Sequence, residues 1–292
     1  MSHSPANSHA SQVYRIAVPG GIEIECQETG TGERPFVLVH GFTGSRDDWR
    51  EHLAPLGNLG RTLAVDQRGH GGSSNTGDAA TYTFEQLCAD LASSLEQCDA
   101  NPCDLLGHSM GGMVALRYVL AHPQRVHSLI LMDTAAGATA ASEPARQMMD
   151  GVGRLARSSG MAAVAEVIRR SMQDGGGFGA TSVSAADAYD TSFERAQPKL
   201  EQMDAVAFAT LGKLLRVQEP VVDRLGEIQC PTTVIVGEAD LPFRQAAQVL
   251  VDGIEGSRLS VIPEAAHQPQ LENPKAWLET VEAHLRRARS AR

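Results

Sequence analysis

The sequence predicts an α/β fold: a mostly parallel eight-stranded sheet with helices on both faces, interrupted by a helical insertion. The first observation is that short apolar runs recur from residue 35 onward, and most precede a longer stretch of helical periodicity. Strands this apolar are usually buried on both faces, as in a parallel sheet covered by helices. The second is that residues 138–222 contain no convincing strand and follow a helical pattern.

The predicted elements follow in chain order. The polar stretch 1–11 is expected to be disordered. Residues 12–30, around Pro19-Gly20-Gly21, predict two strands that form a hairpin at the edge of the sheet. The later strands are expected at 35–41, 61–66, 102–109, 126–133, 231–240 and 257–265, and the alternating helices at about 45–57, 83–98, 111–122, 243–253 and 274–290. We expect one core domain, 12–137 and 223–292, into which 138–222 is inserted.

Composition excludes several classes of protein. The chain has 25 basic and 35 acidic residues, a net charge of −10, which argues against a nucleic-acid partner. Its five cysteines form no C-x-x-C pair and no metal-ligand spacing, so we expect reduced thiols and no metal. We also expect no cofactor. No secretory signal and no apolar run of about 18 residues is evident. We expect a cytoplasmic protein with a small-molecule substrate and no membrane partner, while nothing specifies its oligomeric state.

The stretch "CDLLGHSMGGMVAL" (103–116) predicts a nucleophile at Ser109. Gly-x-Ser-x-Gly lies here between a strand and a helix, the context that gives this short motif its meaning. In so sharp a turn the central residue is strained, and Gly107 and Gly111 remove side chains that would collide with the neighbouring backbone. The hydroxyl then projects clear of the sheet, at a helix N-terminus that favours negative charge.

A serine needs a base to accept its proton and a third group to orient that base. His267, in "VIPEAAHQPQLENP", follows the last predicted strand and therefore belongs to the carboxyl edge of the sheet where Ser109 emerges. His108 adjoins the serine, but neighbouring residues in a tight turn project in different directions. We therefore predict His267 as the base.

The acid is expected at the end of the preceding strand, in "VIVGEADLPF". Asp240 follows that strand after a short turn and would reach the same edge. Two rivals are Glu238, which would face solvent, and Asp133, which could reach the histidine from the neighbouring strand. With Asp240 the chain order is nucleophile, acid and base, as a hydrolase-type turn requires.

Five spaced motifs carry a resemblance to a known family: "HGFTGSRDDW", "DQRGHGGS", "GHSMGG", "GEAD" and "HQPQLENP". From about residue 12 to residue 288 the chain resembles the α/β-hydrolase fold superfamily. The resemblance implies an oxyanion hole formed by the N–H groups of Phe42 and Met110, with His40 and Gly41 supporting the loop. It also implies that 138–222 is a helical cap, and that Arg68 lies in a structural turn.

The resemblance leaves the reaction open. A serine nucleophile excludes the branches that use aspartate, and hydrolysis of a small ester, lactone or thioester is the first hypothesis. Carbon–carbon bond hydrolases of the meta-cleavage type are the second, although these usually carry Asn where this chain has His108, and tryptophans where it has Gln268 and Leu271. A cofactor-free haloperoxidase and a non-catalytic receptor are further alternatives. Ala266 stands where many relatives have glycine.

Overall fold

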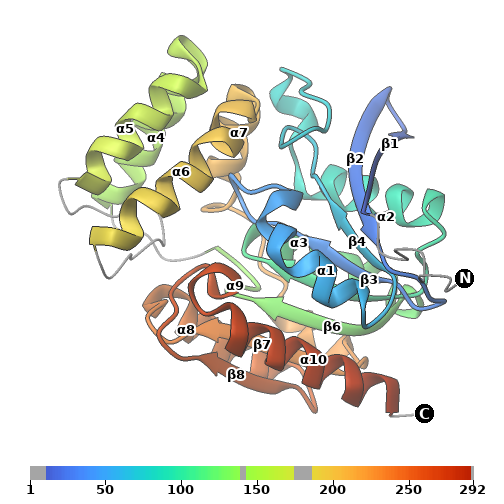
Figure 1. The fold of residues 1–292 in the computed structure, drawn as a ribbon. Helices are drawn as coiled ribbons and strands as arrows, with labels where there is room; N and C mark the ends of the chain where they lie inside the picture. The colour runs from blue at the N-terminus through green and yellow to red at the C-terminus, as the bar shows by residue number, and fades with distance from the viewer. Residues whose placement is uncertain (1–10, 139–142, 174–185, 291–292) are drawn as a thin grey trace, which may run out of the picture.

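The computed structural model describes residues 11–138, 143–173 and 186–290 (Figure 1). Apart from Ser11, the predicted tail 1–11 lies outside these residues. Two parts of the predicted insertion, 139–142 and 174–185, also lie outside them.

Eight strands form one sheet in the order β1-β2-β4-β3-β5-β6-β7-β8. They are β1 Gln12–Val18, β2 Ile22–Thr29, β3 Phe36–Val39, β4 Thr62–Val65, β5 Cys103–His108, β6 Val126–Met132, β7 Thr232–Gly237 and β8 Arg258–Ile262. β1 and β2 pair antiparallel and β2 pairs antiparallel with β4, while all later pairs are parallel. The predicted fold class is confirmed, and each strand lies within its predicted range.

The register brings the ends of the central strands to a common edge. Val39 of β3 pairs with Gly107 of β5, and His108 pairs with Met132 of β6. Farther along the sheet, beyond β6, Gly237 of β7 pairs with Ile262 of β8. Loops that follow the parallel strands therefore meet at the carboxyl edge of the sheet, where side chains from distant segments can converge.

Helices cover both faces of the sheet (Figure 1). They are α1 Arg50–Gly57, α2 Phe84–Gln97, α3 Met110–Ala121, α8 Leu241–Gly253, α9 Pro269–Glu272 and α10 Pro274–Ser290, with short 3-10 turns η1 Arg46–Trp49, η2 Ala79–Thr81, η3 Pro123–Arg125 and η4 Val222–Glu227. Consecutive strand residues separate the two faces: Leu105 joins the cluster under α2, α3 and α8, and Leu106 joins the cluster under α1 and α10. This double burial explains the continuous apolar runs of the sequence.

Among the described residues between β6 and β7 lie four further helices: α4 Glu143–Ser159, α5 Met161–Gln173, α6 Ala186–Gln202 and α7 Ala205–Leu214. In Figure 1 they form a group apart from the sheet. Asp204 attaches this group to the rest of the molecule, because its carboxylate accepts hydrogen bonds from the Tyr82 hydroxyl at 2.5 Å and from the Gly77 N–H at 2.7 Å. The same carboxylate caps the N-terminus of α7.

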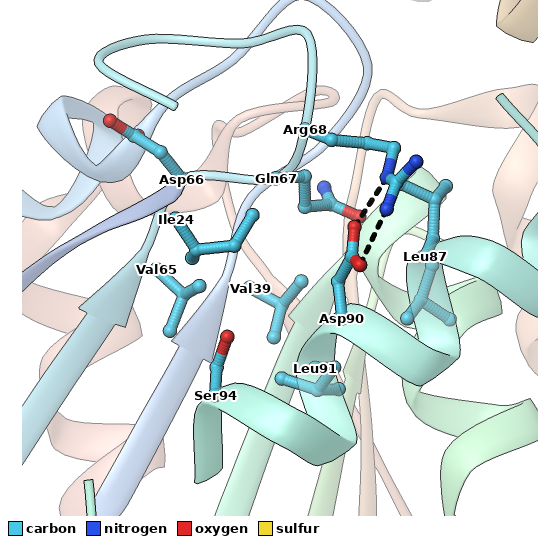
Figure 2. A pocket seen from close by; sticks show the side chains of 11 residues that line it. Ile24, Val39, Val65, Asp66, Gln67, Arg68, Leu87, Asp90, Leu91 and Ser94 are labelled. Carbon is cyan, nitrogen blue, oxygen red and sulfur yellow. Dashed lines mark hydrogen bonds and ion pairs between the residues drawn. The ribbon is translucent and has the colours of Figure 1, made fainter. Parts of the chain in front are cut away.

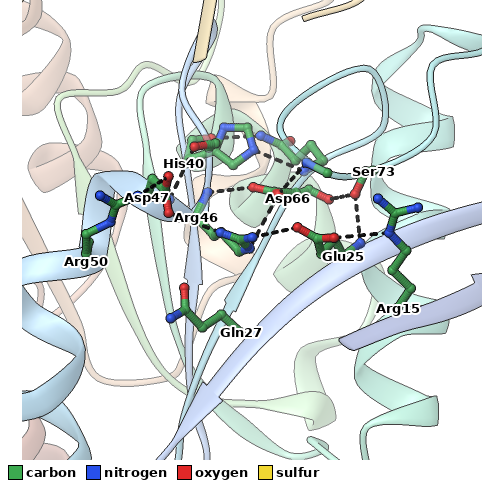
Figure 3. Close-up of polar contacts among 12 residues, drawn as sticks. Arg15, Glu25, Gln27, His40, Arg46, Asp47, Arg50, Asp66 and Ser73 are labelled. Atoms are coloured by element: carbon green, nitrogen blue, oxygen red, sulfur yellow. Dashed lines mark hydrogen bonds and ion pairs between the residues drawn. The ribbon is translucent and has the colours of Figure 1, made fainter. Parts of the chain in front are cut away.

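The loop after β4, which contains "DQRGHGGS", is held by charged side chains. Asp66 accepts hydrogen bonds from the backbone N–H of Arg46 at 2.6 Å and of Gly72 at 2.9 Å (Figure 3). Arg68 forms a two-point ion pair with Asp90 of α2, and both side chains are buried (Figure 2). Both oxygens of Asp90 engage the Arg68 guanidinium, so this ion pair holds the loop against α2.

Candidate active site

Ser109 occupies the sharp turn between β5 and α3. Its backbone angles are φ 51° and ψ −116°, a conformation that non-glycine residues rarely adopt. A Cβ added at Gly107 would lie 2.4 Å from the carbonyl oxygen of Gly111, so the turn closes only with glycine there. This strained turn leaves the serine side chain half-buried, at the carboxyl edge of the sheet.

His267 joins Ser109 to Asp240 in one hydrogen-bonded line. Its Nε2 lies 3.0 Å from Ser109 Oγ, and its Nδ1 lies 2.6 Å from Asp240 Oδ2. Because a carboxylate oxygen can only accept, Nδ1 carries the proton and Nε2 is free to accept the serine proton. The structure thus brings together the three side chains predicted from the sequence, although they lie up to 158 residues apart.

The loop that carries His267 is held on both sides of that residue. Glu272 of α9 accepts hydrogen bonds from the N–H of Ala266 at 2.5 Å and from the N–H of Gln268 at 3.4 Å. Burial raises the pKa of Glu272, and these two N–H groups partly offset the rise. Sequence reasoning did not assign Glu272 a role, although it is the first acid after the predicted base. Ala266 is not among the described residues with positive φ, so glycine is not required there.

The two rival acids lie in different surroundings. Glu238 is exposed, and its carboxylate accepts the N–H of Glu264 at 3.1 Å. Asp133 is 1% exposed at the end of β6, and its Oδ1 accepts the N–H of Gly237 at 2.9 Å. Of the three candidates, Asp240 is the one whose carboxylate is hydrogen-bonded to His267.

His108 and His40 hold main chain in place. Nε2 of His108 lies 2.7 Å from the carbonyl oxygen of His267, to which it donates, and burial lowers the pKa of His108 to about 3. Nε2 of His40 accepts the N–H of Gln67 at 3.0 Å, and its Nδ1 donates to Gly41 O at 2.7 Å (Figure 3). Burial also lowers the pKa of His40. Both rings therefore remain neutral.

The loop after β3 lies directly against the serine turn. A Cβ added at Gly41 would be 3.1 Å from Ser109 Cβ, which brings the following residue, Phe42, beside the turn. The Phe42 ring stacks on Phe208 of α7, with ring centres 5.2 Å apart. Met110 is the first residue of α3, where backbone N–H groups have no partner within the helix.

A family model described as alpha/beta hydrolase fold matches residues 34–274 of this chain. The chain belongs to the α/β-hydrolase fold family. The match spans the elements that carry Ser109, Asp240 and His267, so the resemblance inferred from the motifs is confirmed. With esterases and other hydrolases among its relatives, this α/β hydrolase is an enzyme of the hydrolase type.

Individual relatives differ in their activities. An esterase from Thermogutta terrifontis superimposes with a TM-score of 0.81 at 27% identity, over 95% of this chain and 99% of that one. A putative 2-succinyl-6-hydroxy-2,4-cyclohexadiene-1-carboxylate synthase of Bacillus subtilis is 24% identical over 92% of this chain and 97% of its own length. A 2-hydroxy-6-oxononadienedioate/2-hydroxy-6-oxononatrienedioate hydrolase of Cupriavidus pinatubonensis is 28% identical over 87% of both chains.

Several other curated relatives are longer proteins, of which this α/β hydrolase spans between 21% and 38%. The match does not cover the remaining parts of those relatives. Across residues 11–138, 143–173 and 186–290, no helix combines the length and the apolar character that crossing a bilayer demands.

Proposed function

We propose that this α/β hydrolase is a serine hydrolase that cleaves a small carboxylic ester, lactone or thioester through an acyl-enzyme intermediate. One observation carries the proposal: the unbroken hydrogen-bonded line from Ser109 Oγ through His267 to Asp240. A hydroxyl, an imidazole and a buried carboxylate in this order form an arrangement that activates a serine for nucleophilic acyl transfer.

In the proposed reaction, Ser109 Oγ attacks the carbonyl carbon while His267 Nε2 takes its proton. Asp240 holds the imidazole in the required tautomer and stabilises its positive charge. His267 then returns the proton to the leaving alcohol or thiol, and the acyl group remains on Ser109. Water attacks the acyl-enzyme with His267 again as base, which releases the acid and restores the serine.

The negative charge on the carbonyl oxygen needs donors placed in advance. We assign this role to the N–H groups of Phe42 and Met110, supported by the close approach of Gly41 to Ser109. Each such donor contributes about 3–4 kcal/mol of transition-state stabilisation in comparable enzymes. His40, Gly107, His108 and Gly111 would support this geometry without touching the substrate.

The helices between β6 and β7 are proposed to form a cap, within 138–222, that covers the site. The support is the contact of the Phe42 ring with Phe208 of α7, next to the serine turn. Gly212, also on α7, lies opposite Phe42, since a Cβ added there would meet that ring at 3.3 Å. Apolar side chains of the cap would then select substrates by shape.

The direct test measures hydrolysis of p-nitrophenyl acetate and butyrate, followed by a panel of esters, lactones and thioesters graded by acyl length. S109A should lower kcat by about 10³-fold or more, and a fluorophosphonate should label the wild type at Ser109. S290A, at the exposed end of α10, is the matched control and should behave as the wild type. Absence of turnover together with absence of labelling would contradict the proposal and favour a binding protein.

A second candidate is hydrolysis of a carbon–carbon bond in a vinylogous diketone. The relative from Cupriavidus pinatubonensis favours a substrate other than an ester, because it is named as a hydrolase of 2-hydroxy-6-oxononadienedioate and matches over 87% of both chains. Turnover of dienone substrates without turnover of esters would select this reaction. Ser109, His267 and Asp240 would serve both reactions.

A further inference from the structure

Two buried carboxyl groups lie side by side at the carboxyl edge of the sheet. Asp133 ends β6 and is 1% exposed, and Asp240 follows β7 and is also 1% exposed. A carboxylate oxygen of each and a ring nitrogen of His267 all lie within 4.8 Å of one another. Only Asp240 is hydrogen-bonded to His267, so the proposed mechanism leaves Asp133 without a role.

The hydrogen bonds of the pair leave two oxygens unused. Asp133 Oδ1 accepts from the Gly237 N–H at 2.9 Å, and Asp240 Oδ2 accepts from His267 Nδ1 at 2.6 Å. Asp133 Oδ2 and Asp240 Oδ1 are both buried and have no hydrogen-bond partner among the described residues. A buried acceptor without a donor is costly, and buried polar atoms in folded proteins are almost always satisfied.

A single proton would satisfy both oxygens. Two buried carboxylates whose oxygens lie within 4.8 Å of each other repel when both are ionised, and away from water this favours a proton on one of them. Asp240 Oδ2 already serves as the acceptor of the imidazole N–H of His267. Asp133 accepts a single backbone N–H and has no cationic partner among the described residues, which favours its neutral form.

We propose that Asp133 is protonated at neutral pH and donates a hydrogen bond from Oδ2 to Oδ1 of Asp240. It is then a positioning residue: it fixes the Asp240 carboxylate, which in turn orients His267. The proposal rests on the proposed function for its effect on rate, but not for the protonation itself.

The surroundings agree with a neutral Asp133. Burial and the neighbouring Asp240 raise the pKa of Asp133 well above its usual value, and the Gly237 N–H only partly offsets the rise. The other titratable groups facing the pair are His267, Glu272 of α9 and His108 of β5. Glu272 adds negative potential when ionised, and burial keeps His108 neutral, so neither stabilises a charge on Asp133.

The backbone also suits an aspartate or asparagine at this position. Asp133 has φ 44°, in the left-handed region where these two residues are enriched among non-glycine types. The asparagine of a D133N variant could keep both hydrogen bonds, with its carbonyl oxygen accepting from Gly237 and its amide N–H donating to Asp240. Unlike aspartate, it can never carry a negative charge.

The kinetic test therefore compares D133N with D133A. D133A should lower kcat by about 10-fold or more with little change in KM, because the Asp240 carboxylate is no longer fixed. D133N should recover most of that loss, to within about 3-fold of the wild type, because it keeps the donor. E238Q, which removes an exposed carboxylate at the same strand end, is the matched control. Equal losses in D133N and D133A would overturn the proposal.

An infrared measurement tests the protonation independently of activity and of the fold of D133A. The difference spectrum of wild type minus D133N at neutral pH should contain the carbonyl band of a protonated buried carboxyl group, and wild type minus E238Q should not. A carboxylate band in its place would overturn the proposal. If the wild type hydrolyses no ester, lactone or thioester, the proposed function fails, and the infrared result still decides the state of Asp133.

Discussion

Asp240 is the residue whose chemistry most depends on being a carboxylate. Its Oδ2 accepts the Nδ1 proton of His267 at 2.6 Å, and an amide at this position could present an N–H in place of the oxygen. The ring would then turn or change tautomer, and Nε2 could no longer accept the Ser109 proton.

We predict that D240N lowers kcat by about 10³- to 10⁴-fold, with a small effect on KM. The measurement is the steady-state hydrolysis of p-nitrophenyl acetate, with circular dichroism to establish that the variant is folded. E238Q serves as control, because Glu238 is exposed at the same strand end. A folded D240N enzyme that kept a tenth of the wild-type rate would show that another group orients the histidine.

Asp133 makes stability depend on pH in a predictable direction. In the folded protein its raised pKa keeps the proton bound, whereas in the unfolded chain an aspartate loses its proton above about pH 3.9. Between these two pKa values the folded state holds more protons than the unfolded state, so the wild type loses stability as pH rises. D133N has no such proton to bind.

We therefore predict that the stability of D133N relative to the wild type increases as pH rises from about 4 toward neutrality. Urea unfolding of both proteins at several pH values measures this difference. A difference that stayed constant across the range would mean that Asp133 titrates alike in the folded and unfolded states.

At the scale of elements, the short helix α9 stabilises the loop that carries the proposed base. Glu272 accepts the N–H groups on both sides of His267, and the His52 ring of α1 contacts the carbonyl oxygen of Gln270 at 2.6 Å. From the other side, Gly237 lies so close to the loop that an added Cβ would be 1.9 Å from Ala266 O.

We predict that E272A lowers kcat by about 10-fold or more by releasing the His267 loop, since displacements of about 1 Å can cost that much. E272Q should lose less, because both N–H groups donate to the same Glu272 oxygen and the amide oxygen of glutamine can accept both. Hydrogen exchange of the Ala266 and Gln268 amides should increase in E272A. Unchanged exchange in a slowed variant would show that Glu272 acts through its charge.

At the scale of the whole molecule, a largely buried ion pair joins α6 to the turn η1. Lys199 of α6 contacts Asp48 of η1, and their side chains are 13% and 6% exposed. Burial alone would raise the pKa of Asp48, but Lys199 leaves it lowered. A second ion pair between α6 and this region joins Arg195 to Glu51 of α1, and these side chains are 50% and 56% exposed.

We predict that K199M destabilises the protein by about 3 kcal/mol, because it leaves a buried charge without its partner. The double variant D48N/K199M should recover about 1 kcal/mol or more of that loss. R195M, on the same helix, should change stability by less than about 1 kcal/mol. Chemical denaturation measures these three variants and the single variant D48N, and additive effects of D48N and K199M would mean that the pair is not coupled.

Local patterns in the sequence determined most of the fold. These patterns are the apolar runs on the strands, the helical periodicity between them and the glycines around Ser109. Each of them depends on the backbone conformation and burial of its own segment. The chain order of Ser109, Asp240 and His267 followed from which strand ends precede them. These residues could therefore be named before any contact between them was known.

Only the tertiary structure decided which of several acids faces the imidazole. Asp240, Asp133 and Glu238 lie at adjacent strand ends, and the sequence predicted that Glu238 faces solvent but could not give the distances of the other two from His267. The role of Glu272, the Lys199–Asp48 pair and the two unpartnered oxygens of the aspartate pair were not visible in it either. Each depends on contacts between segments far apart in the chain, and such contacts are set by how the elements pack rather than by the residues beside them.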